Sequence, residues 1–131
     1  MSRYVLDTSA YSHFKRGSPE IVDLIDTAEW IGVPSVVLGE LWAGFLRGRR
    51  ARENESELRE FLANPAVEEM SVDARVARLY AEIVVSLREA GTPLPVNDVW
   101  IAACAAAAGA SVLTYDGHFR HIRRIGSIVL S

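Results

Sequence analysis

The sequence predicts a three-layer α/β/α fold, in which a central, mostly parallel sheet carries helices on both faces. Short apolar runs alternate with stretches of helical periodicity along the chain, and such alternation implies parallel strands joined by right-handed crossovers. The chain has 131 residues, the length of one ordinary domain, and we expect a single domain over residues 1–131. Half of the residues are apolar and 24% are charged, which excludes a disordered or fibrous protein.

The first half of the chain begins with a short strand. The run YVL at residues 4–6 is of the kind that is buried on both faces of a parallel sheet. Ser18 and Pro19 are typical of a helix start, and the helix they begin continues to about Ala28. WIGV at 30–33 predicts a second strand, and a helix opened by Pro34 and Ser35 follows, which stops near Gly48.

The second half repeats this alternation. The charged stretch RGRRARENESELRE covers residues 47–60, and its second half predicts a helix that ends before Pro65. Further strands are expected at 67–72, 111–115 and 127–130, with an amphipathic helix at 76–87 and an alanine-rich helix at 97–109 between them. The alanines allow that last helix to lie close to the sheet.

Charge and cysteine content limit the function classes. The formal net charge of −3 gives no attraction for a polyanion over the whole molecule and would ordinarily argue against a nucleic-acid partner. Cys104 is the only cysteine, so no internal disulfide can form, and a cytoplasmic location is expected. No export signal is recognisable in MSRYVLD. The uncharged stretch from Val99 to Tyr115 is alanine-rich and broken by Gly109, so we expect no membrane span.

Four acids lie in otherwise apolar surroundings: Asp7 after YVL, Glu40 in VVLGELWAGF, Asp98 in PVNDVWIAA and Asp116 after SVLTY. Asp7 and Asp116 each follow the carboxyl end of a predicted strand, where open parallel sheets bind ligands. Each acid alone also has a structural explanation. An Asp at a strand end can cap a turn or helix, and an Asp early in a helix favours the positive helix end.

Together, these acids favour a metal site if the fold brings them to one end of the sheet. Two carboxylates about 4 Å apart repel by roughly 4 kcal/mol at an effective dielectric constant of about 20, so no fold gains stability from the cluster alone. A divalent cation reverses the sign of the interaction. All-oxygen ligands select the hard ions Mg²⁺ or Mn²⁺, which typically work with a substrate phosphate.

The motifs that contain the acids resemble those of a known family. LDTS near the amino end, a helical GE near residue 40, ND followed by IAA, and TYDGHF are similar to the motifs of PIN-domain ribonucleases, most closely the VapC-type toxins of toxin–antitoxin pairs. The resemblance covers essentially the whole chain, in order, and implies a PIN-like fold. It also implies a Mg²⁺- or Mn²⁺-dependent endoribonuclease that hydrolyses RNA phosphodiester bonds.

The resemblance further implies roles for particular residues. It identifies Asp7, Glu40, Asp98 and Asp116 as the catalytic, metal-binding acids. It identifies Thr8, Ser9, Asn97 and Thr114 as their supporting residues. Many relatives have a further acid two residues beyond the fourth, where this chain has His118, and the resemblance leaves the role of His118 open between a metal ligand and a surface or packing residue.

Partners follow from the same resemblance. It implies a cognate antitoxin whose carboxyl-terminal segment binds in a groove near Trp42, Phe45 and Leu46, although core packing is the default interpretation of these side chains. It also implies a homodimer.

The charge objection to RNA loses its force once the acids are treated as one site. Without those four acids the formal charge of −3 becomes +1. The basic loop with Arg47, Arg49, Arg50 and Arg52 is a candidate contact for RNA phosphates, with a simply solvated loop as the alternative. Arg120, Arg123 and Arg124 form a second basic group near the last acid.

Two other functions stay open. A phosphoaspartyl protein, such as a receiver domain or a haloacid-dehalogenase-like phosphatase, also places an Asp at a strand end. Such proteins typically need a lysine after a late strand, whereas Lys15, the only lysine, follows the first strand. Ser9 stands where the phosphatases need a second Asp. The other alternative is a non-catalytic PIN-like module that binds a protein partner.

Overall fold

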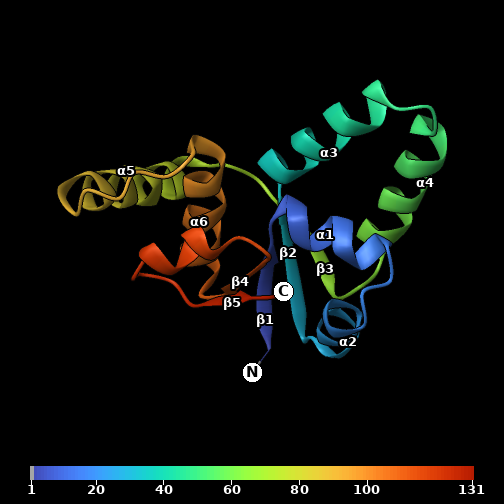
Figure 1. The fold of residues 1–131 in the computed structure, drawn as a ribbon, viewed down its shortest axis with the longest axis horizontal. Helices are drawn as coiled ribbons and strands as arrows, with labels where there is room; N and C mark the ends of the chain where they lie inside the picture. The colour runs from blue at the N-terminus through green and yellow to red at the C-terminus, as the bar shows by residue number, and fades with distance from the viewer. Residues whose placement is uncertain (1) are drawn as a thin grey trace.

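The computed structural model describes residues 2–131 and arranges five parallel strands in the order β3-β2-β1-β4-β5 (Figure 1). The strands are β1 (Arg3–Leu6), β2 (Trp30–Pro34), β3 (Val67–Met70), β4 (Ser111–Thr114) and β5 (Ser127–Val129). Each of these pairings is parallel, which confirms the predicted fold class.

Helices make the connections between the strands. They are α1 (Thr8–Lys15), α2 (Pro19–Thr27), α3 (Ser35–Arg47), α4 (Ala51–Leu62), α5 (Ala74–Glu89) and α6 (Val96–Ala108), with a 3-10 helix η1 (Gly117–His121) before the last strand. Within residues 2–131, none of the helices combines the length and the apolar character that a membrane crossing requires.

Right-handed crossovers decide which face of the sheet each helix covers. From β1 through β2 to β3 the chain moves toward one edge, and from β3 it returns past β1 to β4. Connections that move in opposite directions place their helices on opposite faces when both are right-handed. Accordingly, α6 packs on β1, β2 and β4 with α5 against it, while α1 packs on β1 and β4 from the other face. The α3–α4 pair extends beyond the carboxyl ends of the strands (Figure 1).

The core lies on both faces of the sheet, against α6 on one face and α1 and α2 on the other. Val5 and Leu6 of β1 and Val112 and Leu113 of β4 are fully buried, as continuous apolar runs are in a sheet covered on both faces. The alanines of α6 at 102, 103 and 105 are also fully buried. Their small side chains let the helix approach the sheet closely, as the sequence predicts.

The structure corrects several boundaries. Helix α1 and the 3-10 helix η1 were not expected, because both are short and neither has a clear apolar periodicity. Helix α4 begins at Ala51, earlier in the charged stretch than predicted. The third strand ends at Met70 instead of residue 72, and the last one at Val129 instead of residue 130.

Candidate functional site

The site begins where β1 and β4 end side by side. These neighbouring strands are in register with Leu6 beside Leu113, so the next residues along the chain, Asp7 and Thr114, also lie side by side. The chain runs to opposite edges of the sheet from this pair of strands, which makes their carboxyl ends the switch point at which open parallel sheets bind ligands.

Asp7 is a buried carboxylate held by hydrogen bonds. It caps the start of α1, where its Oδ1 accepts from the Ala10 backbone N–H at 2.8 Å and from the Ser9 hydroxyl at 2.7 Å. Its Oδ2 accepts from the Thr114 hydroxyl. The side chain is 6% exposed, and burial raises the pKa of Asp7 above its usual value against the opposing effect of these bonds.

Ser9 and Thr114 join Asp7 to the segment that carries the fourth acid. The Ser9 Oγ also accepts from the backbone N–H of Tyr115 at 3.1 Å. The Thr114 Oγ1 accepts from the backbone N–H of Asp116 at 2.9 Å. Each hydroxyl therefore donates to Asp7 and accepts from the backbone that leads to Asp116. These bonds fix the position of Asp116 relative to Asp7.

Glu40 reaches the site from α3. Its Oε1 accepts a hydrogen bond from the Thr8 hydroxyl at 2.7 Å. Thr8 is the first residue of α1, directly after Asp7, so this bond brings Glu40 to the same end of the sheet. The Glu40 side chain is exposed and reaches the site from the solvent side.

Asp98 provides the clearest sign that the acids converge. It lies in the first turn of α6 and is half-buried. The pKa of Asp98 is raised from 3.8 to about 6, chiefly by partial burial and then by the negative charges of Asp116, Asp7 and Glu40, in this order. The direction of this shift agrees with a position of Asp98 at the same end of the sheet as the other acids.

Asp116 and His118 complete the group. Asp116 caps η1, and its Oδ1 accepts from the His118 backbone N–H at 2.8 Å. One ligand atom each from Asp98, Asp116 and His118 lie within 4.8 Å of one another.

The acidic cluster has the character of a cation site. Across residues 2–131, no lysine or arginine forms an ion pair with Asp7, Glu40, Asp98 or Asp116. Uncompensated carboxylates at short range destabilise a fold, whereas a hard divalent cation bound by oxygen ligands would stabilise the same arrangement. The residues therefore fit a metal ion, and such a centre can orient and activate water against a phosphate ester.

Other residues singled out in the sequence lie apart from this cluster or beside it. Asn97 is exposed in the first turn of α6, next to Asp98. The basic group formed by Arg47, Arg49, Arg50 and Arg52 lies at the turn between α3 and α4, where Arg50 pairs with Glu53. This turn starts seven residues beyond Glu40, or about 10 Å along the helix.

Two features of the structure lie outside the cluster. Lys15 pairs with Glu57 of α4 at 2.8 Å, so it is not placed to neutralise a phosphoryl group at Asp7.

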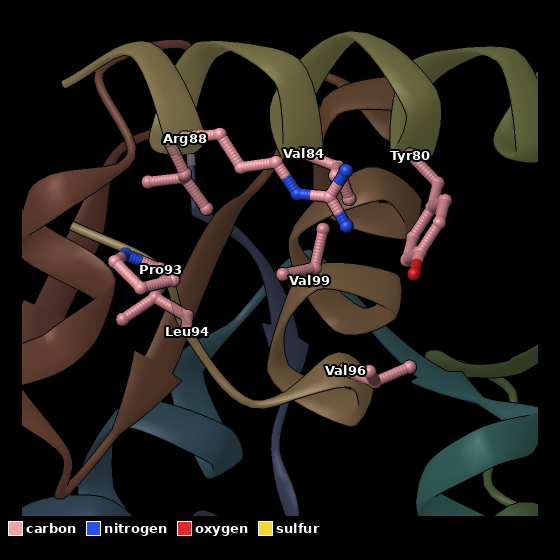
Figure 2. A pocket seen from close by; sticks show the side chains of 8 residues that line it. Tyr80, Val84, Arg88, Pro93, Leu94, Val96 and Val99 are labelled. Carbon is pink, nitrogen blue, oxygen red and sulfur yellow. The ribbon is translucent and has the colours of Figure 1, made fainter. Parts of the chain in front are cut away.

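A cavity of about 110 Å³ lies between α5 and the start of α6, lined by Tyr80, Val84 and Val99 among others, with the Arg88 side chain across it (Figure 2). None of its lining residues is an acid.

Comparison with known proteins agrees with this geometry. Residues 4–125 match the family model of the PIN domain. The chain is 36% identical to Ribonuclease VapC4 of Mycobacterium tuberculosis over 91 residues, which cover 70% of this chain and 69% of the relative. It is 30% identical to Ribonuclease VapC5 of the same species over 124 residues, covering 95% and 90%. The fold matches the crystal structure of VapBC2 from Rickettsia felis bound to a promoter DNA fragment, with TM-score 0.87 and 23% identity over 98% and 99% of the two chains.

The five-stranded parallel sheet, with acids clustered at its carboxyl end, has the architecture of a PIN-like α/β protein. The chain belongs to the PIN-domain family, and within it to the VapC-type ribonuclease toxins of toxin–antitoxin systems. Nucleases of this family use divalent metals, and the acidic cluster described above suits them.

Proposed function

We propose that this chain is an endoribonuclease that hydrolyses RNA phosphodiester bonds with Mg²⁺ or Mn²⁺, as the toxin of a toxin–antitoxin pair. The observation that carries the proposal is the gathering of acids at the carboxyl ends of β1 and β4, where ligand atoms of Asp98 and Asp116 lie within 4.8 Å of each other and the Thr114 hydroxyl links Asp7 to the backbone of Asp116. Family membership supports the same activity.

In this proposal Asp7 and Asp98 are the principal metal ligands, and Glu40 and Asp116 bind the ion directly or through water. A bound divalent ion would lower the pKa of a water bound to it and would place positive charge beside the phosphate. The chain's own hydrogen bonds do the rest of the positioning. Ser9 and Thr114 fix the two oxygens of Asp7, and Thr8 fixes one oxygen of Glu40.

We also propose the course of the reaction and the way RNA is held. In-line attack by water leaves a 5′-phosphate on one product and a 3′-hydroxyl on the other, because the 2′-hydroxyl takes no part. The exposed Arg47, Arg49 and Arg52 at the α3–α4 turn would contact phosphates away from the scissile bond. Asn97, beside Asp98, would support that acid or the substrate.

The antitoxin is the proposed protein partner, and a homodimer the proposed assembly. Trp42 and Leu46 of α3 are 43% and 72% exposed, which is high for large apolar side chains. A groove of about 490 Å³ lies between α3 and α4, lined by Trp42, Leu58 and Leu62 among others. We propose that the carboxyl-terminal segment of the antitoxin occupies it. If Trp42→Ala leaves antitoxin affinity unchanged, the segment binds elsewhere.

The activity is tested by incubating RNA with the purified chain and Mg²⁺ or Mn²⁺. Wild type is compared with an EDTA control, with Asp7→Asn, and with Asp26→Asn as a control for the loss of one negative charge. We expect Asp7→Asn to lower the cleavage rate by about 100-fold or more, since even second-shell changes at metal sites cost 10–100-fold. Product ends that ligate only to 5′-phosphate-dependent adapters support the proposed chemistry. Equal cleavage by wild type and Asp7→Asn would refute the site.

A further inference from the structure

His118 lies at the rim of the acidic site and faces one of the acids. Its Nδ1 is 3.1 Å from the Oδ1 of Asp116, and its side chain is 58% exposed. A histidine that served to fill the core would be buried, as Phe119, the next residue, is. Core packing therefore does not account for the position of the exposed imidazole beside the acid.

The distances around His118 suit coordination of one ion. Neighbouring ligands of an octahedral ion with bonds of about 2.1 Å lie about 3 Å apart, and opposite ligands lie about 4.2 Å apart. The imidazole and Asp116 are separated by 3.1 Å. The group that also includes Asp98 fits within 4.8 Å. Small side-chain rotations would bring all three ligand atoms onto one ion.

An imidazole nitrogen changes which ion the site prefers. Mg²⁺ is bound by oxygen ligands and keeps several waters, so it gains little from a nitrogen ligand. First-row transition ions accept imidazole readily, and their affinity rises from Mn²⁺ through Co²⁺. We propose that His118 is a metal ligand that gives this site a preference for transition ions, Mn²⁺ and Co²⁺, over Mg²⁺. This inference rests on the proposed function, because it assumes that the acids bind a metal.

A different role for His118 has a different consequence. If Nδ1 carries a hydrogen and donates a hydrogen bond to the Asp116 carboxylate, the histidine only positions that carboxylate. Its loss would then weaken Mg²⁺ and Mn²⁺ binding to the same degree, since the same oxygen would be misplaced for both ions. A ligand role instead weakens Mn²⁺ and Co²⁺ binding selectively.

The test measures metal binding directly on the full chain. Free Mn²⁺ is followed by its electron paramagnetic resonance signal, Mg²⁺ by competition against Mn²⁺, and Co²⁺ by its visible absorption, which responds to nitrogen ligation. The variants are His118→Ala and His118→Asp, which supplies an oxygen ligand. His121→Ala is the matched control, because His121 is exposed in the same 3-10 helix and is not in the ligand group.

We expect His118→Ala to lower Mn²⁺ affinity by about tenfold or more, since second-shell changes already cost 10–100-fold, and to change Mg²⁺ affinity much less. His118→Asp should shift the preference back toward Mg²⁺, and His121→Ala should bind as wild type does. Equal losses for both ions in His118→Ala, or no loss for either, would overturn the inference.

Asp98→Asn separates this inference from the proposed function. If Asp98→Asn abolishes binding of both ions while His118→Ala changes neither, the acidic metal site stands and only the role of His118 is wrong. If Asp98→Asn leaves Mn²⁺ and Mg²⁺ affinities unchanged, the proposed metal site itself is wrong, and the His118 inference fails with it.

Discussion

Replacing Asp98 by Asn should stabilise the metal-free protein. The pKa of Asp98 is about 6 in the folded chain and 3.8 in its reference state. The folded protein therefore binds this proton more tightly than the unfolded chain does. The resulting destabilisation by the charged carboxylate is absent below pH 3.8, grows as the pH rises between the two values, and is complete above about pH 6.

The size of the effect follows from the same two values. The difference between about 6 and 3.8 corresponds to about 3 kcal/mol at 1.36 kcal/mol per pH unit. Because Asp98 is only half-buried and is screened by solvent, we expect Asp98→Asn to increase the free energy of unfolding by roughly 1–2 kcal/mol. For a chain of this length, that gain raises Tm by about 4–8 °C.

The assay is thermal unfolding followed by circular dichroism in EDTA at pH 7.5 and at pH 5. At pH 7.5 Asp98→Asn should melt above wild type, and at pH 5 the difference should shrink by about half. Asp26→Asn is the control, because Asp26 is exposed near the end of α2, which leads into the opposite end of the sheet. Addition of Mn²⁺ should raise the Tm of wild type more than the Tm of Asp98→Asn, because a bound ion stabilises only the protein that binds it. A lower Tm for Asp98→Asn in EDTA at pH 7.5 would mean that Asp98 is a structural partner.

Two further predictions concern the surroundings of the acids. Ser9→Ala removes a donor to Asp7 and leaves the Tyr115 N–H without its acceptor, so we expect a loss of about 1–3 kcal/mol in unfolding free energy; an unchanged Tm in chemical and thermal melts would contradict the bridging role. Joint replacement of Arg49 and Arg52 by Ala should reduce the slope of log affinity for single-stranded RNA against log salt by about 1.4, at about 0.7 per phosphate contact. A slope equal to that of wild type in filter binding would show that this loop is simply solvated.

Local sequence patterns were sufficient for much of the fold. Apolar runs identified β1, β2, β4 and β5, and Ser18 with Pro19 correctly marked the start of α2. Helix α1 was missed although Asp7 is a good N-cap, because its buried residues are only Ala10 and Tyr11 and leave no apolar stripe in the sequence. Asp7 ends a core strand because the same carboxylate caps the next helix and lies at the site.

The sequence also singled out the four acids as candidates, because an acid in an apolar stretch is unusual wherever the chain folds. The residues that lie beside these acids in the fold could not be predicted from the sequence. Asp7 lies beside Thr114 because β1 pairs with β4, 107 residues further on. Asp98 is close to Asp7 because α6 packs across those same strands. The approach of His118 to Asp116 likewise depends on the turn of η1.

The sequence by itself determined the layers of this protein, its helices and strands in outline, and which carboxylates stand in apolar stretches. The tertiary structure alone decided that these carboxylates meet, which hydroxyls hold them, and that an imidazole joins them. The physical reason is that residue periodicity reports whether a local segment is buried, whereas neighbours across a sheet are selected by strand order and register. Those are set by long-range packing of the whole chain.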